Sequence, residues 1–219
     1  DYSPIQGPQL PWAAAKIKSV VIESSVTSIG DFAFAGQVGL TSITIPDSVT
    51  SIGDYAFYNC SSLASIAIPN SITSIGQGAF SGCSSLTSIT IPDGVTSIGS
   101  NIFYGCSSLK SITIPDSVTT ICSGAFSDCS GLTSVEIPDS VTSIGNGAFE
   151  YCSALADVYY GGSRVEWNKI GIGRNNYQLT GATIHYAKTD PTATPTQTPM
   201  PTPIVTPNPT ATPAEPPVP

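Results

Sequence analysis

The sequence predicts a repeat solenoid: a right-handed superhelix with a parallel β-sheet on one face and short turns or helical turns on the other. A 23-residue unit recurs six times without an insertion, starting at Val26, Val49, Ile72, Val95, Val118 and Val141. Each unit contains a short apolar alternation typical of a strand. A unit of this size cannot bury its own apolar side, whereas stacked copies can.

The strand is the segment L-x-S-I-x-I, as in Leu86 to Ile91, where apolar and small polar residues alternate. Such alternation predicts a strand with one buried face. The Pro that follows ends the strand, and the next Asp or Asn favours a turn. We therefore expect one parallel strand per repeat and no long helix.

The rest of the unit supplies a second extended piece and a tight turn. V-T-S-I-G is extended and ends at Gly, and A-F-x-x-C is too short for more than one helical turn. Six of the seven Phe occupy one column of the repeat. With strands about 4.8 Å apart, each Phe should meet its equivalent in the next coil. The Leu column, from Leu40 to Leu155, and three Ile/Val columns complete the expected core.

Five of the six cysteines also share one column, with Gln37 in their place in the first repeat: Cys60, Cys83, Cys106, Cys129 and Cys152. Stacked Cβ vectors run parallel, which is poor geometry for a disulfide. We expect buried, reduced thiols that act as small apolar groups and weak donors to turn carbonyls. Cys122 instead replaces the Gly of V-T-S-I-G and is expected to be an accessible thiol.

The ends of the array differ from its middle. Residues 1–25 are expected to form an N-terminal cap and half repeat, with Leu10 and Trp12 as a lid, ahead of the six repeats at 26–163. Residues 164–188 are expected to form a C-terminal cap in which Trp167 occupies the Ile column of a degenerate seventh unit. The segment ATIHY predicts a last strand, and its His185 is interpreted as a cap residue without a carboxylate partner.

Residues 189–219 are rich in Pro and Thr and predict an extended linker. Linkers of this composition tether modules of secreted bacterial proteins. The chain begins without Met or a signal peptide, so we interpret it as mature or trimmed and expect it to continue past Pro219.

The charge distribution argues against several partners. The formal net charge is -8, and residues 19–163 contain eleven Asp or Glu and one base, Lys110. Such a surface repels nucleic acid and anionic lipid. No apolar run approaches the ~20 residues that span a bilayer, so membrane insertion is not expected. No motif for a catalytic site, a cofactor or a Cys/His metal centre is present.

The repeat, with its I-P-x-x-V-T-x-I-G-x-x-A-F-x-x-C-x-x-L core, resembles the BspA-like (Treponema pallidum type) leucine-rich repeats of bacterial surface proteins. The resemblance covers roughly Ile17 to Tyr186, and the ending YYGGS…EWN…ATIHY is similar to the close of such arrays. It implies a curved solenoid, a secreted or cell-surface location, and a binding or adhesive role without catalytic residues.

The exposed face of the predicted sheet is the first candidate binding surface. Its outward residues in the C-terminal half are Ser88, Thr90, Ser111, Thr113, Ser134, Glu136, Asp157 and Tyr159. A cluster of Glu136, Asp157, Tyr159 and Tyr160 makes the C-terminal end the first place to look for a hot spot. Two alternatives are a solvated face of neutral residues and, because Ser and Thr recur regularly, an ice-binding surface.

Two further sets of residues are candidate sites. The turn column Asp47, Asn70, Asp93, Asp116 and Asp139 could bridge calcium through its oxygens, although turn-forming residues that face water are the simpler interpretation. Residues Tyr58, Tyr104, Glu150 and Tyr151 are expected to form a second, convex surface.

These observations predict a monomeric, non-catalytic extracellular module that recognises a protein or glycan ligand on host or neighbouring cells. The alternatives are a structural spacer and an accessory module of a larger secreted enzyme or surface protein.

Overall fold

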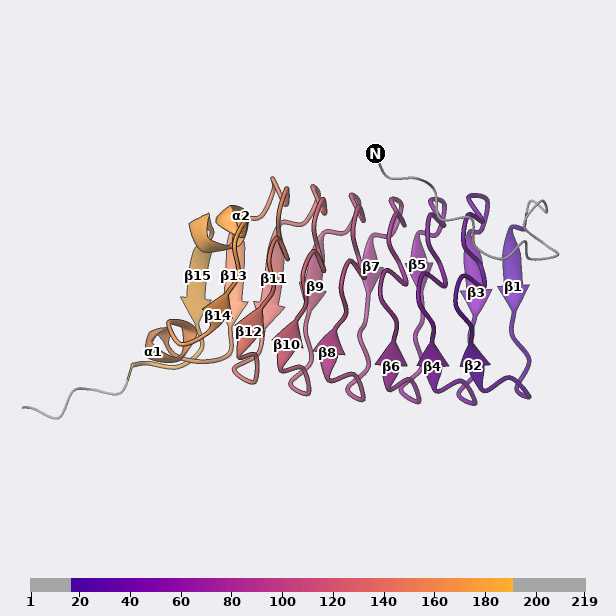
Figure 1. The fold of residues 1–219 in the computed structure, drawn as a ribbon, viewed down its shortest axis with the longest axis horizontal. Coiled ribbons are helices and arrows are strands. Elements are labelled where there is room, and N and C mark those ends of the chain that lie inside the picture. The colour runs from indigo at the N-terminus through magenta and orange to yellow at the C-terminus, as the bar shows by residue number, and fades with distance from the viewer. Residues whose placement is uncertain (1–16, 191–219) are drawn as a thin grey trace, which may run out of the picture.

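The structure is a computed structural model in which residues 17–190 are described. The expected lid residues Leu10 and Trp12, and the Pro/Thr segment after Asp190, lie outside the described residues. Within them, the chain winds into a regular β-solenoid whose coils lie side by side along one axis (Figure 1). This arrangement confirms the predicted stack of repeats.

Each coil contributes a strand to a parallel ladder, which we call the first ladder. Its strands come from the L-x-S-I-x-I segments and from ATIHY. They are β1 (Ser19–Val21), β3 (Ser42–Thr44), β5 (Ser65–Ile66), β7 (Ser88–Ile89), β9 (Ser111–Thr113), β11 (Ser134–Ile137), β13 (Asp157–Tyr160) and β15 (Thr183–Tyr186). Equivalent residues pair across neighbouring coils, as in Ser19 with Ser42 and Ser111 with Ser134. The paired strands form three sheets, β1-β3, β5-β7 and β9-β11-β13-β15, which lie next to one another along the row.

A second parallel ladder corrects the expectation of one strand per repeat, because the V-T-S-I-G segments also pair with one another, in the two sheets β2-β4-β6 and β8-β10-β12-β14. Its strands are β2 (Ser28–Ile29), β4 (Ser51–Ile52), β6 (Ser74–Ile75), β8 (Ser97–Ile98), β10 (Thr120–Ile121), β12 (Ser143–Ile144) and β14 (Gly171–Ile172). Once the coils are stacked in register by the first ladder, any extended segment meets its own copy at the strand spacing. The solenoid therefore carries a narrow ladder on each side of its core (Figure 1).

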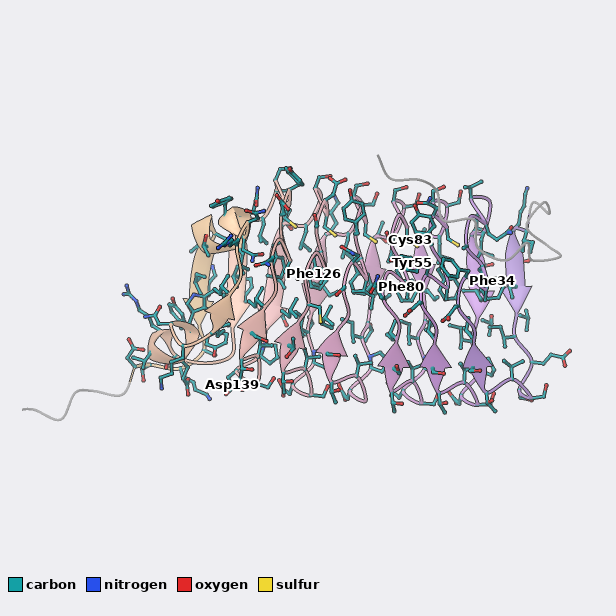
Figure 2. All side chains as sticks on the ribbon, viewed as in Figure 1. Phe34, Tyr55, Phe80, Cys83, Phe126 and Asp139 are labelled. Carbon is teal, nitrogen blue, oxygen red and sulfur yellow. The ribbon has the colours of Figure 1, made fainter. Side chains whose placement is uncertain are left out.

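The core between the two ladders is built from aligned columns. The rings of Phe34, Phe57, Phe80, Phe103, Phe126 and Phe149 stack one on the next, with ring centroids 5.1 to 5.8 Å apart. Phe57 and its successors are fully buried, whereas Phe34 at the N-terminal end is half-buried. Figure 2 shows Phe34, Phe80 and Phe126 along this row. Offset stacking of this kind adds to the stabilisation from burial.

The cysteine column is a ladder of free thiols, as predicted. All five column thiols are fully buried, and Cys122 is half-buried. Each column Sγ donates to the carbonyl of the Phe in the preceding repeat, as Cys60 does to Phe34 at 3.2 Å and Cys129 to Phe103 at 3.1 Å. Burial raises the pKa of Cys60 and of Cys152 to about 12. These thiols therefore remain protonated at neutral pH.

Serine and threonine hydroxyls tie neighbouring coils together at their turns. Ser48, Ser71, Ser117 and Ser140, each the last residue of a repeat, donate to the carbonyl of the first residue of the same repeat, at 2.6 to 2.7 Å. Gly94 occupies this column in one repeat, and a Cβ there would lie 3.0 Å from the carbonyl oxygen of Ile72. The small polar columns of the repeat therefore include structural residues, which lowers the number available for binding.

Each repeat also has two turn positions with a left-handed backbone. The first is occupied by Phe32, Tyr55, Gly78, Asn101, Gly124 and Gly147, and the second by Gly36, Asn59, Gly82, Gly105, Asp128 and Tyr151. Gly, Asn and Asp adopt this conformation readily, whereas aromatic residues rarely do. Phe32, Tyr55 and Tyr151 are therefore exceptions to the chemistry of their columns.

The C-terminal cap departs from the predicted seventh unit. Trp167 ends the short helix α1 (Arg164–Trp167) and packs edge-on against Tyr160, with ring centroids 5.2 Å apart. Ile172 of β14 holds the Ile column instead, paired with Ile144. The prediction for Trp167 was wrong because it continued the 23-residue spacing, whereas α1 lengthens this coil. The helix begins at a capping box formed by Ser163 and Glu166.

Asn176 accepts the last of a series of hydrogen bonds that run from the Phe N–H of each repeat to the next coil. In the repeats, the Phe N–H donates to a carbonyl of the next coil, as Phe126 does to Ala148 at 2.7 Å. For Phe149 the acceptor is the side-chain Oδ1 of Asn176, at 3.0 Å. Asn176 is buried just before helix α2 (Tyr177–Gly181), whose Leu179 is fully buried. A side-chain amide thus replaces the missing next repeat.

Candidate functional site

The first ladder places the predicted binding residues on its outward side. The inward alternate residues, such as Ile89, Ile112 and Val135, are buried in the core. Of the eight predicted residues, Ser134 and Asp157 are half-buried and the others are exposed: Ser88, Thr90, Ser111, Thr113, Glu136 and Tyr159. The prediction that these side chains lie at the surface is therefore confirmed, while their role in binding stays a prediction.

Parallel pairing brings four dissimilar side chains into one row at the C-terminal end of this face. Thr113 pairs with Glu136, Glu136 with Tyr159, and Tyr159 with His185. The Thr113 hydroxyl donates to Oε2 of Glu136 at 3.1 Å. The Tyr159 and His185 rings stack with centroids 4.7 Å apart and planes inclined by 14°. We call these four residues the terminal row.

His185 is the member of the terminal row that the sequence analysis missed. Its Nε2 lies 2.7 Å from Oδ1 of Asp157, which corrects the expectation that no carboxylate accompanies it. Aligning T-I-H-Y of β15 with D-V-Y-Y of β13 would have placed His185 opposite Tyr159. The 26-residue offset between these strands hid the match, because every earlier strand of the ladder follows its neighbour by 23 residues.

Tyr160 is almost fully buried beneath this surface, which corrects its inclusion in the predicted exposed cluster. It is 2% exposed and faces the core, where its ring contacts Trp167. Burial raises the pKa of Tyr160, and the nearby carboxylates of Glu166 and Asp139 raise it further. The alternation of a strand explains the difference, because Tyr159 and Tyr160 must point to opposite faces.

A shallow depression of about 330 Å³ lies over the end of the first ladder. Its lining residues are Thr113, Ile114, Asp116, Glu136, Ile137, Pro138, Tyr159, Tyr160, Gly161, His185, Tyr186 and Ala187. Two are carboxylates, and none is Lys or Arg. The neighbouring Lys188 bonds to Asp139, and this bond raises the pKa of Lys188. The surface thus combines exposed aromatic rings with acidic side chains.

The predicted second surface lies on the turns. Tyr58, Tyr104 and Tyr151 are 38%, 45% and 62% exposed, and Glu150 is half-buried. Tyr58 packs edge-on against Tyr55, with centroids 5.9 Å apart, and Tyr55 stacks on Phe32 at 5.2 Å. Phe32, Tyr55 and Tyr58 thus contact one another in the first two repeats, so part of the surface of Tyr58 is already used in packing.

The turn column of Asp47, Asn70, Asp93, Asp116 and Asp139 is exposed along one edge of the solenoid, where Figure 2 labels Asp139. Within residues 17–190, no group of three or more His, Cys, Asp or Glu side chains is arranged to hold a metal ion. In the same part of the chain, no helix has the length and apolar character needed to cross a membrane.

Comparisons with known proteins agree with this architecture. The family model of the BspA type leucine rich repeat region matches residues 12–130 and 79–171, in six copies. The crystal structure of a leucine rich repeat protein from T. pallidum superimposes with a TM-score of 0.65 at 34% sequence identity. That match covers 72% of this chain and 74% of the T. pallidum chain. A search of curated proteins finds no match.

Two further solved structures are similar over part of their length. A leucine rich cell surface protein from Faecalibacterium prausnitzii has 28% identity and a TM-score of 0.50, and a leucine-rich repeat protein from Eubacterium ventriosum has 32% and 0.60. The matches cover 71% and 66% of this chain, but 62% and 39% of those proteins. The chain, with its six consecutive repeats, belongs to the BspA type leucine rich repeat family.

Proposed function

We propose that the chain is a non-catalytic binding module that acts outside the cell and contacts its partner through the C-terminal half of the first-ladder face. The terminal row carries this proposal. Most of the face presents Ser and Thr, whereas this end presents Glu136, Tyr159 and His185 around a depression. Aromatic residues are enriched where protein surfaces bind partners tightly, and Ser and Thr are under-represented there.

The exposure of the terminal row favours binding over catalysis. The side chains of His185 and Asp157 are 45% and 41% exposed, so water surrounds the pair. Enzymes gain most of their electrostatic stabilisation in sites that exclude water. The Thr113 hydroxyl, which lines the depression, donates to Glu136 and not to His185. An open pair of this kind suits recognition of a polar partner.

An extracellular location is supported by similarity and composition. One similar structure is that of a leucine rich cell surface protein, with which the chain shares 28% identity. The Pro/Thr composition of residues 191–219 suits a spacer between a module and an anchor or a further domain. On this basis the partner is a protein or glycan on a host or neighbouring cell.

A structural spacer is the second candidate function, and the uniform Ser/Thr character of β3 to β9 favours it. A spacer needs a regular stack and a solvated surface, and it has no requirement for the terminal row. An accessory module of a larger secreted protein would share these properties. Variants of the terminal row separate binding from both alternatives.

The test immobilises the full chain at high density and passes soluble matrix proteins and glycans over it. We expect a hit whose avid binding falls by about tenfold in Tyr159→Ala, because a hot-spot aromatic is removed. The control Ser74→Ala changes an exposed residue of the second ladder and should bind like the parent chain. No hit across the panel would support the spacer instead, and equal losses in both variants would contradict the terminal row as the contact.

A further inference from the structure

The terminal row also indicates which chemical group it recognises, and this inference rests on the proposed function. We infer that the site binds the guanidinium group of an arginine side chain on a protein partner. Three observations carry the inference: the orientation of the Tyr159 ring, the position of the Glu136 carboxylate, and the charge of the surrounding surface.

Tyr159 is 47% exposed, and its ring stacks on His185. The two ring centroids lie 4.7 Å apart, which matches the spacing of adjacent strands, so His185 covers one face of the Tyr159 ring. The ring planes therefore lie roughly across the ladder axis. Glu136 precedes Tyr159 in the ladder, so the second face of the ring is turned toward the Glu136 side. A flat cation placed there would stack on the ring.

Two contacts hold these groups in place before any ligand arrives. Oδ1 of Asp157 lies 2.7 Å from Nε2 of His185, and this contact holds the imidazole against Tyr159. Thr113 donates to one oxygen of Glu136 at 3.1 Å. A carboxylate can accept about four hydrogen bonds, so Glu136 retains capacity for the N–H groups of a ligand. The site is thus pre-organised on strands β9, β11, β13 and β15.

The local charge favours a cation. The depression is lined by the carboxylates of Asp116 and Glu136, and its only basic lining residue, His185, contacts Asp157. The surrounding repeats, residues 19–163, carry eleven acidic residues and one basic residue, a formal charge of -10. An arginine at the depression would be attracted by Asp116 and Glu136 and by the acidic repeats on one side, whereas the adjoining residues 164–188 carry four basic residues and one acidic residue.

A guanidinium suits this geometry better than an ammonium. It is planar, so it can stack on Tyr159, and its N–H groups form a fork that matches a carboxylate. The ammonium of lysine is a strongly hydrated point charge that lacks both features. The depression of about 330 Å³ is open and shallow, which suits one side chain presented by a larger partner.

The experiment compares three peptides that differ at one residue: arginine, lysine or citrulline, the neutral isostere of arginine. Each is displayed at high density, and binding of the full chain is measured in low salt. We expect the arginine peptide to bind about tenfold more avidly than the citrulline peptide, with lysine in between. Glu136→Gln and Tyr159→Leu should each reduce arginine binding to the citrulline level.

Glu150→Gln is the matched control, because it removes the same charge from the turn surface and leaves the terminal row intact. It should change arginine binding by less than about twofold. Equal binding of arginine and citrulline peptides, or equal losses in Glu136→Gln and Glu150→Gln, would overturn the inference. A matrix protein that still requires Tyr159 but ignores free arginine peptides would leave the proposed function standing and refute only the arginine site. Circular dichroism confirms that each variant keeps its strands.

Discussion

At the scale of single residues, each repeat requires a left-handed backbone at two turn positions whose residue type varies from repeat to repeat. Periodicity identifies the inward Phe, Leu and Cys columns directly, because their side chains are conserved from coil to coil within this chain. The two left-handed positions are filled by Gly, Asn, Asp and three aromatic residues, so their letters give no single signal. The aromatic exceptions at Phe32, Tyr55 and Tyr151 obscure the glycine preference that the other repeats show. Only the backbone angles reveal it.

Gly105→Ala tests this requirement without a steric complication. Gly105 has φ +71°, and the nearest atoms to an added Cβ are backbone atoms of Gly82 at 3.9 Å. The cost is therefore conformational, and we expect the free energy of unfolding to fall by about 1 kcal/mol. Chemical denaturation measures the change.

Gly99→Ala provides the control, because Gly99 is not left-handed and an added Cβ would lie 3.6 Å from the carbonyl oxygen of Ile75. It should stay within about 0.5 kcal/mol of the parent chain. Similar losses in the two variants would mean that contacts, and not backbone angles, determine the tolerance of the turns.

At the scale of elements, the sequence predicts the first ladder well and the terminal coil poorly. Regular spacing places each L-x-S-I-x-I strand beside its copy, and the structure agrees. The same spacing fails after Asp157, where α1 and α2 lengthen the coils and shift the partners of Ile144 and Tyr159 to Ile172 and His185. The sequence predicts V-T-S-I-G as extended but not as a paired strand, because its pairing depends on the stacking of the coils.

The thiol ladder predicts a loss of stability at alkaline pH. Burial raises the pKa of Cys60 and Cys152 to about 12, and that of Cys106 well above its usual value, so the folded state keeps these protons. The unfolded chain releases them near pH 8.5. Stability from each thiol is thus complete below that pH and is lost as the pH rises, by roughly 1.4 kcal/mol per pH unit.

Melting temperatures measured from pH 7 to pH 10.5 check this prediction. The parent chain should show a steep decline above about pH 9. Cys106→Ala removes one of the buried thiols and should make the decline shallower, even though it lowers the melting temperature at pH 7 by leaving a cavity. Cys122→Ala removes the half-buried thiol and should leave the slope almost unchanged. A parent chain with a flat profile to pH 10.5 would contradict the account.

At the scale of the whole molecule, charge is separated along the solenoid axis. Residues 19–163 carry a formal charge of -10, whereas residues 164–188 contain four of the chain's seven basic residues and one acidic residue. The terminal row lies where these regions meet, at the orange end of the solenoid in Figure 1. Sequence composition alone predicts the acidic body. Placing Glu136, Tyr159 and His185 in one row required the pairing of β11, β13 and β15.

The most direct test of the account maps the contact surface on the molecule itself. The ¹⁵N-labelled full chain is titrated with the single-arginine peptide, and its amide resonances are followed by nuclear magnetic resonance. Shifts should concentrate at Thr113, Glu136, Tyr159 and His185, because these residues form one row of the first ladder. Shifts confined to the second ladder, or to the turns that carry Tyr58, Tyr104 and Tyr151, would contradict the assignment of the binding surface.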